Sequence, residues 1–181
     1  MKELSLHIID IVQNSIAAGA NLIQINIVED LTTDIFSIEV IDNGSGMDKE
    51  YAEKIKDPFI THRTSRKVGL GVPLLYATSK RCNGDLQIES EKGKGTKIFA
   101  YLKHSHIDRA PLGSMADTME ILIMCNPEVD FQYNHTFNEK EFRFDTKEIK
   151  KTLGSIPINE LEVIIWIKEY IYEGLSNLME V

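Results

Sequence analysis

Two polar side chains near the amino terminus have the chemistry that magnesium binding and phosphoryl transfer require. Asp10 and Asn14 are four residues apart, so both project from one face of a helix. A carboxylate can orient or deprotonate a nucleophile, and an amide oxygen can complete an octahedral Mg²⁺ shell with phosphates and waters. The alternative is that both side chains belong to the exposed polar stripe of an amphipathic helix.

A second group of candidate residues directly follows a predicted apolar strand. Residues 42–46 read DNGSG, and Asn-Gly after an alternating run is a strong signal for a hairpin turn. Residues 47–52, however, look helical and not like a returning strand. In that case Asp42 can accept a hydrogen bond from an adenine amino group, while Gly44 and Gly46 let the backbone pass close to the base.

A basic loop that leads into a glycine turn forms the third group. Arg63 and Lys67 precede Gly69-Leu70-Gly71, which opens a predicted helix. Free amide groups at a helix N-terminus bind anions when small residues precede them, so this segment predicts a phosphate site. The pattern is neither a P-loop nor a dinucleotide-binding fingerprint.

The hydrophobic pattern predicts the elements that must position these residues. Apolar residues recur with helical spacing first, and runs rich in β-branched residues follow in pairs. The predicted helices span 3–18, 48–55, 72–81 and 115–124, with two more after Asp145 and Asn159, and the predicted strands span 22–27, 35–41, 85–90, 96–102 and a hairpin over 131–144 that turns near residues 138–139.

Composition excludes several classes of function. The formal net charge of the 181 residues is −8, which argues against non-specific binding to nucleic acid or to an anionic membrane. No apolar run approaches the ~20 residues that span a bilayer, and acidic Glu3 and Asp10 interrupt any signal peptide. Cys82 and Cys125 are too few for a disulfide framework. We therefore expect a cytoplasmic protein that binds neither nucleic acid nor membrane.

The order of the motifs resembles the complete motif series of the GHKL ATPase superfamily, which joins gyrase, heat-shock chaperones, histidine kinases and mismatch-repair proteins. The resemblance covers about residues 1–103, and it implies ATP and Mg²⁺ as ligands. It rests on five motifs in order: Asp10-x-x-x-Asn14, Asp42-x-Gly44-x-Gly46, Asp57-Pro58-Phe59, Gly69-Leu70-Gly71 and Gly93-x-Gly95-Thr96.

The resemblance implies a role for each matching residue near the adenine and the metal. Asn14 would bind Mg²⁺, and Asp10 stands where many members have the glutamate that activates or positions the attacking group. Asp42 would read the adenine amino group, with Gly46 near the base and Thr96 in support. Gly44 and Met47 complete the set that we expect to bind nucleotide.

Phosphate binding is the role that the resemblance implies for the segment that closes the site. The loop from residue 47 to residue 69 would form a lid, with Arg63, Arg66 and Lys67 as candidate phosphate contacts. Gly69, Leu70 and Gly71 would cradle the phosphates. The chain departs from the family at Lys67, which replaces a glycine of many histidine kinases, and at Asp10, which is one methylene shorter than glutamate and puts fast hydrolysis in doubt.

The resemblance also implies the fold and the organisation of the chain. We expect an α+β protein: residues 1–103 form a two-layer α/β sandwich of the Bergerat type, a mixed sheet with helices on one face. Residues 104–181 form a small α+β extension packed on it. Residues 14–20 and 41–44 look like the mismatch-repair branch, whereas the sequence from Asp57 onward looks like the histidine-kinase branch.

The expected function is that of a Mg-dependent ATP-binding protein, a stand-alone histidine kinase-like ATPase or kinase module that regulates a partner protein. Two alternatives stay open. Residues 105–112 resemble the phosphoacceptor box S-H-x-x-R-x-P-L, which would make His106 a site of autophosphorylation unless it lies in an ordinary connector. The chain could instead be a non-catalytic, nucleotide-dependent interaction module. The sequence names neither the partner nor the oligomeric state.

Overall fold

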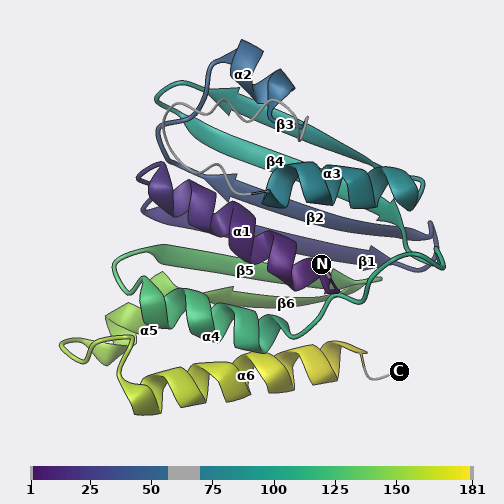
Figure 1. Ribbon diagram of the computed structural model, residues 1–181. Coiled ribbons are helices and arrows are strands. Elements are labelled where there is room, and N and C mark those ends of the chain that lie inside the picture. Colours follow the sequence, from purple (N-terminus) through teal and green to yellow (C-terminus); the bar gives the residue numbers. More distant parts are fainter. Residues whose placement is uncertain (1, 57–69, 180–181) are drawn as a thin grey trace.

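The computed structural model describes residues 2–56 and 70–179, which form one mixed sheet and a layer of helices (Figure 1). The strand order is β3-β4-β2-β1-β5-β6, and every neighbouring pair is antiparallel except β1 and β5. The strands are β1 (Leu22–Asp30), β2 (Ile35–Asp42), β3 (Asp85–Glu91), β4 (Gly95–Lys103), β5 (Asp130–Phe137) and β6 (Lys140–Asp145).

The helices cover one face of this sheet. In Figure 1, α1, α3, α4 and α6 all lie on the same side of the strands. The helices are α1 (Leu4–Ala17), α2 (Lys49–Lys54), α3 (Gly71–Arg81), α4 (Met115–Cys125), α5 (Thr146–Leu153) and α6 (Leu161–Met179). The expectation of an α+β fold with a mixed sheet is confirmed. No helix within the described residues has the length and apolar character that a membrane span requires.

Alternation along the strands explains why only one face is covered. In β1, Ile23, Ile25 and Ile27 are fully buried toward the helices, whereas the residues between them are only partly buried. Successive side chains of a strand point to opposite faces, so Gln24 and Asn26 face away from the helices. One face of the sheet therefore builds the core, and the other stays polar.

Polar side chains form a ladder across the uncovered face. Lys97 Nζ on β4 lies 2.7 Å from Glu39 Oε2 on β2, and Asn26 Nδ2 on β1 donates to Glu39 Oε1 at 2.9 Å. Asn134 Nδ2 on β5 continues the ladder by donating to Asn26 Oδ1 at 2.8 Å. Cross-strand pairs of this kind stabilise neighbouring strands, and the ladder carries this contact from β4 as far as β5.

The residues after 103 join the same sheet. β5 pairs in parallel with β1 from Leu22↔Asp130 to Glu29↔Phe137, and β6 returns beside β5. A parallel pair needs a crossover connection, which here includes α4. The division of the chain into an ATP-binding domain of residues 1–103 and an extension of residues 104–181 remains a prediction.

A buried polar network connects the two parts of the chain on the helix side of the sheet. Glu29 on β1 contacts His135 Nε2 at 3.1 Å through Oε1 and His104 Nε2 at 2.9 Å through Oε2. Tyr133 Oη lies 2.8 Å from His135 Nδ1. Burial alone would raise the pKa of the Glu29 carboxyl, but the hydrogen bonds to His135 and His104 outweigh it and hold that pKa below its ordinary value.

Candidate functional site

A cavity of about 210 Å³ lies between α1, the loop after β2, α2, the start of α3 and β4. It brings together residues that are far apart in the sequence, because the ends of β2 and β4 lie side by side and Asp42 pairs with Thr96. Its lining is mainly apolar with a few polar groups, as in small-molecule sites generally. The lining residues are Ile11, Asn14, Ser15, Ala17, Ala18, Asp42, Ser45, Gly46, Met47, Tyr51, Ile55, Val72, Thr96 and Ile98.

Two hydrogen bonds fix the Asp42 carboxylate in this cavity. Ser15 Oγ donates to Oδ2 at 2.7 Å, and the Gly44 backbone N–H donates to Oδ1 at 2.8 Å. The loop after Asp42 is itself tied to α1, because the Ser45 N–H donates to the Ala18 carbonyl at 2.8 Å. A carboxylate held in this way presents its remaining acceptor positions to a ligand that donates hydrogen bonds.

Gly46 lets this loop lie against the β3–β4 turn. Its φ is 63°, and a Cβ at this position would lie 2.1 Å from the Glu91 carbonyl oxygen. No side chain fits there, so the loop can reach the cavity only with glycine. The motif predicted that Gly46 lets the backbone approach the base. In the structure, Gly46 lets the backbone approach another segment of the protein.

Thr96 lines the cavity opposite Asp42, and Ser90 holds it in place. Ser90 Oγ lies 2.9 Å from Thr96 Oγ1, donates to the Gly95 carbonyl at 3.0 Å and accepts from the Met47 N–H at 2.8 Å. Ser90 therefore connects β3, β4 and the loop that carries Met47.

The predicted metal and phosphate residues meet where α1 approaches α3. Asn14 lines the cavity, and a Cβ on Gly71 would lie 2.5 Å from the Cβ of Asp10. The absence of a side chain at Gly71 lets the N-terminus of α3 approach α1 this closely. Leu70 occupies the N-cap position of α3, and a leucine side chain cannot cap the first amide groups of a helix, which suits anion binding.

Arg63, Arg66, Lys67, Gly69 and the motif of residues 57–59 fall outside the described residues. Among the described residues, His106 lies away from the cavity. His106 lies beyond the far end of β4, whose course from Thr96 to Lys103 measures about 23 Å at the usual rise of a strand. His106 Nδ1 accepts a hydrogen bond from the Asp108 N–H at 3.1 Å.

Sequence reasoning did not single out three residues that shape the cavity: Tyr51, Ile55 and Ser90. It grouped Ser15 with Asp10 and Asn14 but gave it no role of its own. Tyr51 lies in α2 and Ile55 is the C-cap residue of this helix, and residues four apart share one helix face. Ser90 had no local signal, because only the register of β3 and β4 places it beside Thr96.

The fold and this site define a class: a two-layer α/β sandwich with a mainly apolar cavity that is lined by one fixed carboxylate at the end of a strand. The family of histidine kinase-, DNA gyrase B-, and HSP90-like ATPases matches residues 2–106. The chain belongs to this family, and it therefore carries an ATP-binding domain. Its resemblance to the GHKL superfamily is confirmed.

Individual proteins that are similar to this chain include two kinases. The sensor kinase CckA of Brucella abortus (strain 2308) is 35% identical over 92 residues, 48% of this chain and 10% of that protein. Sporulation kinase C of Bacillus subtilis (strain 168) is 35% identical over 88 residues, 49% of this chain and 20% of that protein. The chain therefore spans a fifth or less of the length of these curated relatives.

A solved structure shows a similar fold. The crystal structure of the N-terminal domain of a DNA repair protein has a TM-score of 0.56 and 19% sequence identity, and the match covers 86% of this chain and 58% of that chain. At this identity the likeness concerns the fold alone.

Proposed function

We propose that this chain is a cytoplasmic, magnesium-dependent, histidine kinase-like ATPase or kinase module that regulates a partner protein. The observation that carries the proposal is the fixed Asp42 carboxylate in an otherwise mainly apolar cavity. Apolar walls from α1, α2 and β4 suit the faces of an adenine ring, and the carboxylate suits its amino group. The relatives named as sensor and sporulation kinases support phosphoryl transfer as the chemistry.

The residues beside the cavity fit a magnesium ion bound together with phosphates. Asn14 would hold the ion through its amide oxygen, which is the kind of hard oxygen ligand that Mg²⁺ takes. When bound, the ion would neutralise charge on the phosphates during transfer. The amide groups at the start of α3 would hold phosphate oxygens next to Gly71. Asp10, against Gly71, would orient the water or the acceptor group.

The position of His106 counts against phosphorylation of this residue by the cavity of the same chain. It lies beyond the end of β4 opposite to Thr96, and phosphoryl transfer needs the acceptor in contact with the terminal phosphate. An acceptor on another molecule therefore fits the site better.

Calorimetric titration with ATP, with and without Mg²⁺, tests the proposal on the wild type and two variants. We expect Asp42→Asn to abolish binding, because its amide would present a donor to the adenine amino group. Asn14→Ala should remove the Mg²⁺ dependence and leave weak binding that does not depend on the metal. Wild-type protein that binds no adenine nucleotide would overturn the proposal.

A further inference from the structure

The free edge of the sheet at β6 directs backbone groups to solvent. The two-residue loop Asn138–Glu139 places Phe137 opposite Lys140, and hydrogen-bonded pairs alternate from this closing pair onward. Residues of even number in β6 thus bond to β5. Glu141 and Arg143 direct their N–H and carbonyl groups away from β5, toward the edge, and both residues are exposed.

A groove runs between this edge and α6. It has a volume of about 430 Å³. Its lining consists of Phe142, Tyr170, Gly174 and Leu178 together with four polar or charged residues, Lys140, Glu141, Glu173 and Asn177. The rings of Phe142 and Tyr170 lie 5.8 Å apart, and a Cβ on Gly174 would lie 2.1 Å from the Phe142 ring. The groove therefore has an aromatic floor with polar residues around it, and it lies beside the outward-facing backbone groups of β6.

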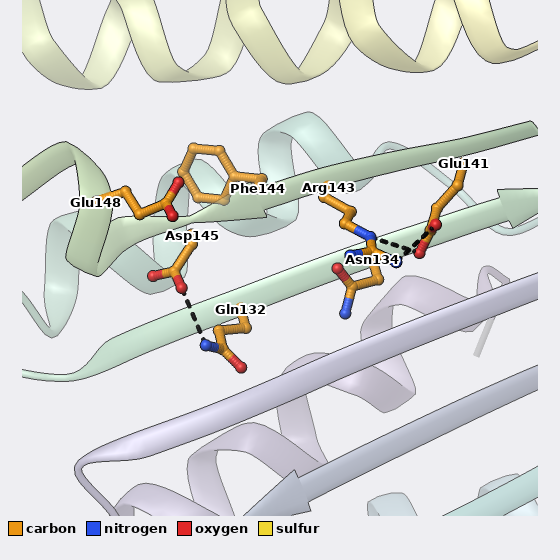
Figure 2. Close-up of a pocket in the computed structure, with 7 residues that line it drawn as sticks. All are labelled: Gln132, Asn134, Glu141, Arg143, Phe144, Asp145 and Glu148. Carbon is orange, nitrogen blue, oxygen red and sulfur yellow. Dashed lines mark hydrogen bonds and ion pairs between the residues drawn. The ribbon is translucent and has the colours of Figure 1, made fainter.

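A second cavity lies over β5 and β6 on the face of the sheet that the helices leave uncovered (Figure 2). It measures about 430 Å³, and its ionisable lining residues are three carboxylates, Glu141, Asp145 and Glu148, and one guanidinium, that of Arg143. Arg143 is paired with Glu141, and Asp145 accepts a hydrogen bond from Gln132 Nε2 at 2.9 Å, as Figure 2 shows. The cavity is polar, and its charge favours a cationic group.

We propose that an extended segment of a partner protein adds to β6 as a further strand, with apolar side chains alternating with basic ones. Side chains of a strand alternate between faces, so the apolar set would fill the groove under α6. The basic set would meet the carboxylates of the uncovered face. Backbone hydrogen bonds to Glu141 and Arg143 would supply affinity, and the two cavities would supply specificity.

The other free edge of the sheet differs in the lining of its cavity. The cavity of about 460 Å³ between β3 and α2 has no aromatic residue among its described lining residues, and two of those residues are lysines, Lys49 and Lys92. A lone segment needs room for one strand only. A second copy that paired antiparallel through β6 would also bring its own α6 to the same face of the joint, because α6 lies on one face of the sheet in each copy (Figure 1).

Fluorescence anisotropy of a short labelled peptide that alternates valine and lysine tests this inference. The measurement needs no nucleotide, so its outcome is independent of the proposed function. We expect saturable binding of this peptide and none of the matched peptide that alternates valine and glutamate. Equal binding of the two peptides would overturn the proposal.

Two variants of Arg143 distinguish the contribution of its backbone N–H to peptide binding from that of its side chain. Arg143→Pro removes an N–H that faces the edge, which a proline on an edge strand tolerates, so we expect roughly tenfold weaker binding. Arg143→Ala removes the same charge and keeps the N–H, and it should bind the lysine peptide at least as tightly as the wild type. Unchanged binding by Arg143→Pro would contradict strand addition.

N-methylated peptides repeat the test on unaltered protein. Only alternate residues of an added strand direct their N–H toward β6. Methylation of one alternate set should abolish binding, whereas methylation of the other set should leave it within about twofold. Equal effects of both sets would exclude strand addition. A dimer in sedimentation that Arg143→Pro dissociates would instead assign the edge to a second copy, which also overturns the proposal.

Discussion

The cavity proposed to bind nucleotide and the β6 edge are built on opposite principles. In the cavity, the polar groups that would meet the ligand already have protein partners, Asp42 through Ser15 and Thr96 through Ser90. At the β6 edge, backbone groups face solvent, and the stacked aromatic side chains of α6 are exposed, with Trp166 at 50% and Tyr170 at 43%. Fixed groups recognise one small ligand with little reorganisation, whereas an open edge accepts a polymer that brings its own hydrogen bonds.

Among the variants considered, we expect a substitution of Gly46 to disturb the structure of the cavity most. Gly46→Val would place a side chain against the Glu91 carbonyl and force φ of 63° on a β-branched residue. We expect a loss of about 4 kcal/mol or more in the free energy of unfolding and no detectable ATP binding. Chemical denaturation and calorimetry measure the two effects.

Gly93→Ala is the matched control for Gly46. Gly93 also has a positive φ, of 84°, but a Cβ there would have no atom within 4 Å. We expect a loss of about 1 kcal/mol and ATP binding close to that of the wild type. Similar losses for both variants would show that backbone conformation, and not the close approach, explains the requirement for glycine.

The comparison also explains which features the sequence could predict. Asp42, Gly46 and Gly71 act through their own chemistry or through the lack of a side chain, so local motifs can point to them. Asp42 and Gly46 line the cavity and Gly71 begins α3, while their roles in binding stay predictions. Ser90 acts only through the pairing of β3 with β4, and no local pattern encodes that register. The same holds for the parallel pairing of β5 with β1, because hydrophobic alternation indicates a strand without naming its neighbour.

The buried network around Glu29 tests whether the strands after residue 103 stabilise the ATP-binding part. Glu29→Gln keeps the size of the side chain and removes the charge that contacts His135 and His104. At pH 7 we expect a loss of about 2 kcal/mol in the free energy of unfolding. The more exposed Glu39→Gln on β2 should cost less. Equal losses would mean that the network does not join the two parts.

The free energy of unfolding measured at acid pH provides a second test of the network around Glu29. The pKa of Glu29 is lower in the folded protein than its ordinary value of 4.5, so the folded state favours the charged carboxylate. Its contribution is complete above pH 4.5 and is lost as the pH falls through the lower, folded pKa. The wild type should therefore lose stability in this acid range more steeply than Glu29→Gln, as denaturation at a series of pH values would measure. Parallel curves would contradict this.

The smallest expected effect is that of Ser15→Ala. This variant sharpens the comparison between the cavity and the β6 edge, because it changes how firmly Asp42 is held and leaves Asp42 itself in place. Ser15→Ala removes the 2.7 Å hydrogen bond to Asp42 and leaves its bond from Gly44. The carboxylate then has to be oriented by ATP itself, so we expect roughly tenfold weaker binding with unchanged Mg²⁺ dependence.

Ser176→Ala on α6 is the control, since its hydroxyl bonds a carbonyl four residues earlier, as Ser15 also does with Ile11. It should leave ATP binding unchanged. If calorimetry gives the same affinity for Ser15→Ala as for the wild type, the Gly44 amide alone fixes Asp42, and the preorganisation of the cavity resides in its backbone.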